Sequence, residues 1–473
     1  MRVAWQSSWW LWLRRASVVL LLALVGLGVR LYYRHHQAVA KLDEALAALD
    51  RDEPGWRLED VEAAREEIPE GQNSARAVLA AARLLPRPWP PPGFDDLFVQ
   101  LTPTEQLAPE ASARLNQELE DLRPALEEAR ALTALPHGRY PIAYQGLVYE
   151  TLLPHADKVR QVSHLLTRDA LRHEQRSDLN AALASCRASL NAARSLGDEP
   201  VALSQLVRTA CVINTCQALE RALAQGEPPP GGLTVMQGAL HGEDGFPDML
   251  VAARGERAAL HATFSALESG AVPPSRLESK PPNWLDYLYG PATRIKFREA
   301  HPAMLEPMNR FVEIARLPPH EQDAAERQLD SELRGLKRSD PLAVLFIPAL
   351  QKVSQAACRK HAYLRCMEVA LAAERYRQAN KKWPELLDNL CPDLLAAVPL
   401  DPFDGQPLRY RRLEDGVMIY SVSHDGEDNG GNLDPAHPMQ PGVDVGCRLW
   451  DVKHRRRPPR PPGKEAPDEG AAP

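Results

Sequence analysis

A long apolar run near the N-terminus constrains this 473-residue chain more than any other feature. Its uninterrupted core covers residues 16–29, which would span about 21 Å as a helix, short of the roughly 30 Å hydrocarbon core of a bilayer. Extended to residues 11–33, the segment reaches a spanning length if the flanking arginines reach the two interfaces. We therefore predict that residues 1–36 form a membrane helix.

Aromatic residues flank this run on both sides, as in proteins that span a bilayer. They are Trp9, Trp10, Trp12, Tyr32 and Tyr33. These belts favour an uncleaved anchor. The alternative is a cleaved signal segment and a secreted protein, because the short apolar core also suits a signal peptide and Gly26-Leu27-Gly28 is a small-x-small site.

Basic residues are balanced around the apolar run, so they do not decide its orientation. A short tail before the helix and a large domain after it are typical of a signal anchor. We expect a single-pass protein of the inner (cytoplasmic) membrane of a bacterium, with residues 37–473 outside the cytoplasm.

The middle of the chain predicts a mainly α-helical protein. Aromatic residues make up only 6% of the sequence, and Ala, Leu and Arg dominate residues 37–340, which favours helix over sheet. This range is predicted to be an extracytoplasmic helical domain. The net charge of −7 is mixed along the chain and does not indicate a nucleic-acid partner.

The clearest helical pair covers residues 178–224. Leu179, Leu183 and Leu190 repeat at helical spacing, and Gly197 separates them from the second helix. The pair weakly resembles a tetratricopeptide-type hairpin in architecture. The signature of that family is absent and no 34-residue period is sustained, so an irregular bundle of helical hairpins and a solenoid both stay open.

The composition changes near residue 340, and residues 341–450 predict a small α+β module. A helix is expected over residues 348–380, ending before Trp383-Pro384. The stretches "LRYRR" and "VMIYSVS" then alternate with the period of a strand, and Asp415-Gly416 between them is a hairpin turn.

Three motifs in this module occur in a characteristic order: Tyr376 followed by Trp383-Pro384, then "VPLDPFDGQPLRY", then "IYSVSHDG". The combination resembles the C-terminal half of bacterial type II secretion major pseudopilins over about 85 residues, under a fifth of the chain. The resemblance implies a pilin-like module with a short antiparallel sheet. Because no prepilin-peptidase start precedes the module, we expect a borrowed domain, with a role in a type II secretion pseudopilus as the alternative.

The loop "SVSHDGEDNGGNLD", residues 421–434, is rich in acids and glycines. In the resembled pseudopilins this loop binds calcium, which implies a structural calcium ion held here by the Val422 carbonyl and Asp425, with Asn432 or Asp434 as later ligands. Asp428 is a further candidate by its chemistry. An EF-hand is excluded because its twelfth position is Ala436. An acidic, glycine-rich turn without metal is the alternative.

Catalytic motifs are missing from the sequence. It contains no P-loop, no GxSxG and no HExxH, and its seven cysteines form no CxxC pair. We predict no enzymatic activity, no small-molecule substrate and no nucleic-acid partner, but a binding or scaffolding role with protein partners in the envelope. An envelope enzyme is the alternative, because a catalytic site is defined by geometry rather than by order in the sequence.

The Pro- and Arg-rich residues 451–473 are predicted to be a disordered tail.

Overall fold

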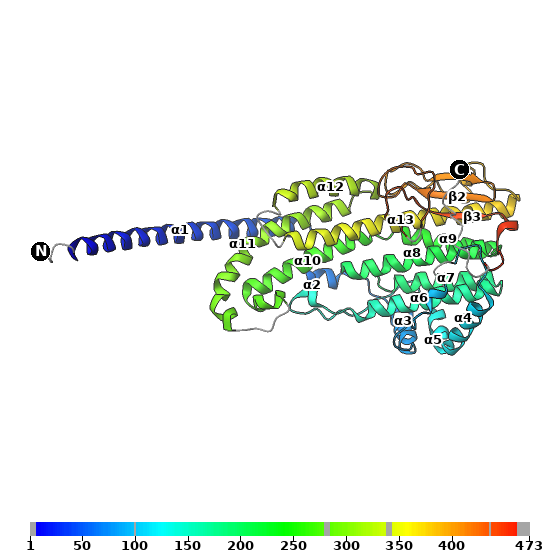
Figure 1. Cartoon of the computed structure of the whole chain (residues 1–473), viewed down its shortest axis with the longest axis horizontal. Coiled ribbons are helices and arrows are strands. Elements are labelled where there is room, and N and C mark those ends of the chain that lie inside the picture. Colours follow the sequence, from blue (N-terminus) through cyan, green and yellow to red (C-terminus); the bar gives the residue numbers. More distant parts are fainter. Residues whose placement is uncertain (1–5, 99–100, 279–283, 337–342, 435–436, 461–473) are drawn as a thin grey trace. The chain divides into compact units, whose positions relative to one another are not determined.

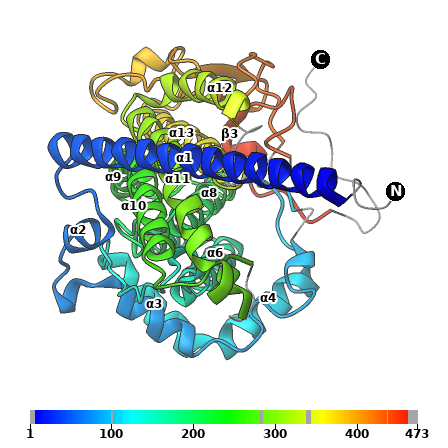
Figure 2. The same ribbon diagram turned by 90° about the vertical axis from the view of Figure 1, so that its left-hand side faces the viewer.

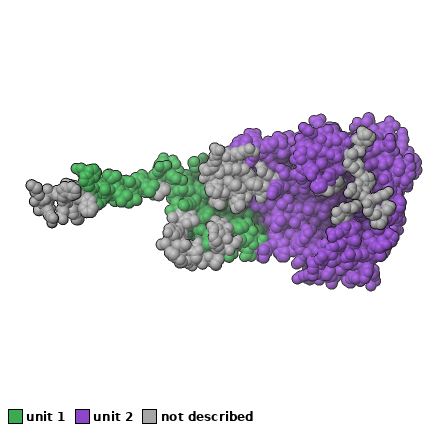
Figure 3. Space-filling view, in the orientation of Figure 1, with its two compact units in different colours: residues 1–61, 144–151, 257–309 green, residues 62–143, 152–256, 310–473 purple. Residues whose placement is uncertain are grey.

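The structure, a computed structural model, describes residues 6–98, 101–278, 284–336, 343–434 and 437–460. The chain forms two compact units, coloured in Figure 3. Unit 1 comprises residues 1–61, 144–151 and 257–309, and unit 2 comprises residues 62–143, 152–256 and 310–473.

Unit 1 begins with α1 (Gln6–Asp52), a single continuous helix. Its N-terminal part is long and apolar enough to cross a membrane, and the side chains there are exposed. Further along, Ala38, Leu42 and Leu49 are buried, so the same helix continues into the folded unit. The predicted N-terminal apolar helix is confirmed, and the boundary predicted at residue 36 lies inside one helix.

Helices from distant parts of the sequence complete unit 1. These are the C-terminal half of α10 (Asp248–Ser269) and most of α11 (Trp284–Ala315), with the 3₁₀ turn η4 (Val148–Glu150). Leu49, Trp56 and Leu305 form a small core. The helix α2 (Leu58–Ala63) follows α1, and the division between unit 1 and unit 2 falls within it, after residue 61.

Unit 2 is built mainly of helices arranged in successive layers. Their bounds are α3 (Ser74–Arg83), α4 (Pro109–Asp121), α5 (Arg123–Arg130), α6 (Pro154–Gln175), α7 (Leu179–Arg194), α8 (Ala202–Ala224), α9 (Pro230–Asp244), α12 (Pro319–Leu336) and α13 (Ala343–Asn380). Figures 1 and 2 show α12 on one side, then α13, α8 and α6, with α3 and α4 on the opposite side.

The predicted helical pair over residues 178–224 is confirmed as α7 and α8. The Asp178 side chain caps α7 by accepting a hydrogen bond from Ala181 N at 3.1 Å. Gly197 adopts a φ of 57° after the helix ends, a conformation that favours glycine. The helix α8 packs against α6, α7 and α13, so it lies inside a helical bundle.

The C-terminal sheet has three antiparallel strands in the order β1-β2-β3. They are β1 (Arg409–Leu413), β2 (Gly416–Ser421) and β3 (Val445–Trp450). The hairpin predicted at Asp415-Gly416 is confirmed, with Leu413 paired to Gly416. A Cβ at residue 416 would lie 1.9 Å from the Leu449 carbonyl oxygen, so only glycine fits beside β3. The mainly α fold with a short antiparallel sheet is therefore as predicted.

The helix α13 is enclosed on both sides. One side packs against α8 and α9, and the other against β2 and β3 (Figure 1). Between Ala362 and Ala373 every side chain but that of Arg365 is buried. One hydrophobic core contains residues from α3 to β3. Residues on both sides of the domain boundary predicted near residue 340 therefore belong to the same unit, unit 2.

Residues 451–460, predicted from composition to be disordered, are instead an ordered part of unit 2. They include the 3₁₀ turn η7 (Val452–His454). Arg455 is buried and pairs with Glu374 at 2.8 Å, and Arg460 pairs with Glu105 at 2.6 Å. A buried acid on α13 and a partly buried acid in the loop before α4 therefore hold these arginines. The rest of the predicted tail, residues 461–473, lies outside the described residues.

Candidate functional site

The buried side chain of Asp401 joins two of the sequence motifs into one site. Its carboxylate accepts hydrogen bonds from Ser421 Oγ at 2.8 Å and Val422 N at 2.9 Å. It also accepts from Phe403 N at 2.9 Å and Arg409 Nη1 at 2.6 Å. Burial raises the pKa of Asp401, while these hydrogen bonds from backbone and Ser421 oppose the rise. The "DPFDGQPLRY" and "IYS" motifs therefore meet at a single carboxylate, which fixes the start of the acidic loop.

Asp425 lies at the centre of the loop that follows. Its carboxylate accepts hydrogen bonds from Gly442 N at 2.8 Å and Glu427 N at 3.1 Å. Burial raises the pKa of Asp425, but the backbone donors outweigh it and the pKa lies below its ordinary value. The carboxylate is thus held ionised by main-chain dipoles.

Asp444, which sequence reasoning missed, lies close to Asp425. Its carboxylate accepts from Gly431 N at 2.8 Å, and burial raises its pKa. Asn429 Nδ2 lies 3.4 Å from Asp425 Oδ2 and 3.5 Å from Asp444 Oδ1, so one amide joins the two acids. Asp444 directly precedes β3, the strand that pairs with β2, and the acidic loop follows β2. An acid at this position was the sequence signal from which Asp444 could have been identified.

The other four predicted ligands point to different partners. Asp428 accepts from the Tyr420 hydroxyl at 3.1 Å, and Asp434 pairs with His437 at 2.9 Å. Asn432 Nδ2 donates to the Gly442 carbonyl at 2.6 Å. Val422 is buried, with its N–H bonded to Asp401. Each of these residues has a hydrogen-bond or ion-pair partner within the protein, and the described part of the chain contains no group of three His, Cys, Asp or Glu side chains that could hold a metal ion.

Calcium binding by this loop stays a prediction, and thermal unfolding tests it. An ion that binds only the native loop must raise the melting temperature. We expect a higher melting temperature in calcium than in chelator, and no such difference in Asp425→Asn. Asp393→Asn, a change at an exposed acid outside the loop, is the matched control. Equal melting temperatures of the wild-type protein in calcium and in chelator would contradict the prediction.

A second polar site, also missed in the sequence, connects α9 and α13; we term it the α9–α13 ladder. Four contacts define it: Gln237 Oε1 to Arg375 Nη1 at 2.7 Å, His241 Nδ1 to Glu368 at 3.1 Å, Asp244 to His361 Nδ1 at 2.7 Å and Asp244 to Arg365 Nε at 3.0 Å. The four α13 positions recur at steps of three, four and seven, which places them on one helix face. This face of α13 is therefore polar and matched to α9.

Beside the ladder lies a largely buried group of charges. Glu243 accepts hydrogen bonds from Arg208 at 2.8 Å through both carboxylate oxygens, and from Arg194 at 2.9 Å. Lys360 Nζ lies 2.8 Å from Asp248 and 3.9 Å from Glu243, with no exposed surface. Burial raises the pKa of Glu243, but Arg208, Lys360 and Arg194 lower it more strongly, to about 2. These charges stay ionised inside the protein because they are paired.

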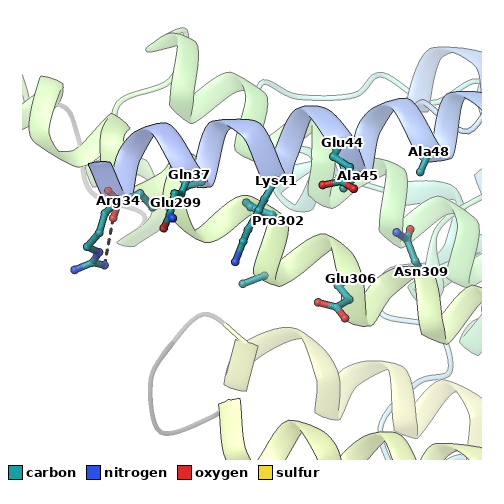
Figure 4. Close-up of a pocket in the computed structure, with 12 residues that line it drawn as sticks. Arg34, Gln37, Lys41, Glu44, Ala45, Ala48, Glu299, Pro302, Glu306 and Asn309 are labelled. Atoms are coloured by element: carbon teal, nitrogen blue, oxygen red, sulfur yellow. Dashed lines mark ion pairs between the residues drawn. The ribbon is translucent and has the colours of Figure 1, made fainter. Parts of the chain in front are cut away.

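Unit 1 contains a chain of hydrogen-bonding side chains with the residue types of acid–base chemistry. His301 Nδ1 lies 2.6 Å from Glu268, and His301 Nε2 lies 3.2 Å from His261 Nδ1. Burial, together with the neighbouring His301, lowers the pKa of His261 to about 4. None of the three residues lines the groove of unit 1 shown in Figure 4.

The chain matches no protein-family model, no curated protein and no solved structure. Its function therefore has to be argued from the geometry of these sites.

Proposed function

We propose that this is a membrane-anchored, extracytoplasmic binding or scaffolding protein without enzymatic activity, in which a pseudopilin-like module is fixed to a helical body. The observation that carries the proposal is the enclosure of α13 between the sheet and α8 and α9. Assembly into a filament through this helix would require an exposed face, and its central residues are buried.

The α9–α13 ladder supports the same proposal. Separating α13 from α9 would expose apolar surface, take Lys360 away from Glu243, and take Arg365 away from Asp244. Breaking a buried ion pair costs about 3–5 kcal/mol. A module that had to leave the helical body in order to assemble would have to overcome this cost. In a scaffold, the same contacts keep α13 in place.

The alternative of an envelope enzyme rests on the Glu268–His301–His261 chain. A general base has to reach its substrate directly or through one water molecule. The groove of unit 1 is lined by other residues, so a substrate in that groove would not contact the three side chains. We therefore place the binding role first.

Cross-linking in intact cells tests whether the module stays fixed. The side chains of His241 and Glu368 meet at 3.1 Å, from Nδ1 to Oε1, so His241→Cys with Glu368→Cys places two thiols that a short bifunctional thiol reagent can bridge, which locks α13 to α9. We expect the bridged, locked protein to cross-link to the same envelope proteins as the wild type. The His241→Ser, Glu368→Ser pair is the matched control. A series of self-cross-linked multimers that disappears on locking would instead indicate assembly into a pseudopilus.

A further inference from the structure

Unit 1 contains a groove formed by one face of α1 and one face of α11. It has a volume of about 720 Å³ and is lined by α1 from Arg34 to Ala48 and by α11 from Glu299 to Asn309 (Figure 4). The two helices run in the same direction, because Arg34 pairs with Glu299 at 3.5 Å and both lining segments then proceed along the groove.

The groove begins where the exposed apolar part of α1 ends. From Trp12 to Tyr33 the described side chains are exposed, and burial begins just beyond, at His35 and Ala38. These 22 residues of helix span about 33 Å, close to the roughly 30 Å hydrocarbon core. In a membrane-anchored protein, which is the function proposed above, Arg34 would therefore lie at the level of the lipid headgroups.

Charges along the groove follow a definite order away from the membrane. Arg34 comes first, paired with Glu299, and Lys41 follows about 10 Å further along the helix. Glu44 and Glu306 come next (Figure 4). Lys41, Glu44 and Glu306 are exposed and have no ion-pair partner among the described residues. The groove thus offers a cation nearer the membrane and two carboxylates further out.

The direction of the side chains brings these groups closer to the bilayer. Side chains on a helix tilt toward its N-terminus. The N-terminal ends of the lining segments of α1 and α11 both face the membrane side, so Lys41, Glu44 and Glu306 lean toward the headgroups. A long Lys side chain extends this reach further.

We propose that the groove binds the headgroup of a phospholipid that carries a phosphate and a primary amine, as in phosphatidylethanolamine. In such a lipid the phosphate adjoins the glycerol and the ammonium is distal, which is the order of Lys41 and the unpaired carboxylates Glu44 and Glu306 along the groove. The phosphate pairs with Arg34 and Lys41, and the ammonium donates hydrogen bonds to Glu44 and Glu306. A choline headgroup has no N–H to donate, and an anionic headgroup without an amine leaves both carboxylates facing a negative charge.

Lipid retention by the full-length protein tests the assignment. The protein is assembled into nanodiscs of phosphatidylcholine alone, or with added phosphatidylethanolamine or phosphatidylglycerol, and retained lipids are identified by native mass spectrometry. We expect selective retention of phosphatidylethanolamine. Lys41→Gln and Glu306→Gln should each reduce it about tenfold, as expected for the loss of one charge-assisted hydrogen bond. Glu306→Gln should also raise the retention of phosphatidylglycerol.

Two exposed residues outside the groove provide matched controls. Lys352→Gln and Glu313→Gln make the same chemical changes in unit 2 and should leave lipid retention unchanged. Equal retention of the three lipids, or a preference of the wild type for phosphatidylglycerol, would overturn the assignment. Failure of the protein to insert into nanodiscs at all would instead count against the membrane anchor on which the assignment rests.

Discussion

Glu243→Gln is expected to lower the free energy of unfolding of this protein by about 3–5 kcal/mol, the usual cost of breaking a buried ion pair. The amide keeps the shape of the carboxylate but removes the negative charge that faces Arg208 and Arg194. The buried Arg208, the partly buried Arg194 and the buried Lys360 at 3.9 Å would then be left with less compensation. Denaturant unfolding monitored by circular dichroism measures the loss.

An exposed ion pair provides the control for Glu243. Glu120 lies 3.4 Å from Arg123, and both side chains are more than 60% exposed. Glu120→Gln should change the stability by about 0–1 kcal/mol. A loss below about 1 kcal/mol in Glu243→Gln would contradict the argument that its charge is needed.

The Glu243 carboxylate should also contribute to the pH dependence of the free energy of unfolding. The pKa of Glu243 is about 2 in the folded protein, below its ordinary value of 4.5. Its contribution to stability is therefore complete above pH 4.5 and is lost as the pH falls toward 2. Glu243→Gln should remove this part of the acid sensitivity of the wild type.

Asp401→Ala is expected to lower the free energy of unfolding by about 2–4 kcal/mol and to loosen the loop after β2. The change removes the acceptor for the N–H groups of Phe403 and Val422 and for the Ser421 hydroxyl. Each buried polar group left unpaired costs about 1–3 kcal/mol. Hydrogen exchange should accelerate in β2 and in residues 421–434.

Asp393→Ala is the matched control for Asp401, because Asp393 is exposed in the same module. It should leave both stability and hydrogen exchange unchanged. If the amides of residues 421–434 exchange at the wild-type rate in Asp401→Ala, this carboxylate does not organise the loop.

Local sequence patterns predicted much of the fold. The apolar run predicted the N-terminal helix, and helical spacing of Leu183 and Leu190 predicted α7. Strand alternation and Asp415-Gly416 predicted the β1–β2 hairpin. Each of these features depends on residues close together in the chain, so a short window of sequence contains the whole signal.

The candidate sites were predicted less well, because their residues lie far apart in the sequence. Asp425 was identified, but its neighbour Asp444, which lies directly before the next strand, was not. The α9–α13 ladder joins residues more than 100 positions apart, such as Asp244 and His361. A polar residue on a helix suggests a solvated face until the facing helix is known.

The sequence by itself determined where the helices and the hairpin form and that the first helix is long and apolar enough to cross a membrane. Only the tertiary structure decided that α13 is enclosed, that its buried charged residues such as Lys360 are paired, and that Arg455 fixes residues 451–460 by binding Glu374. The physical reason is that backbone conformation follows from local sterics and periodicity. The state of a buried charge instead depends on which partner the fold brings within a few ångströms.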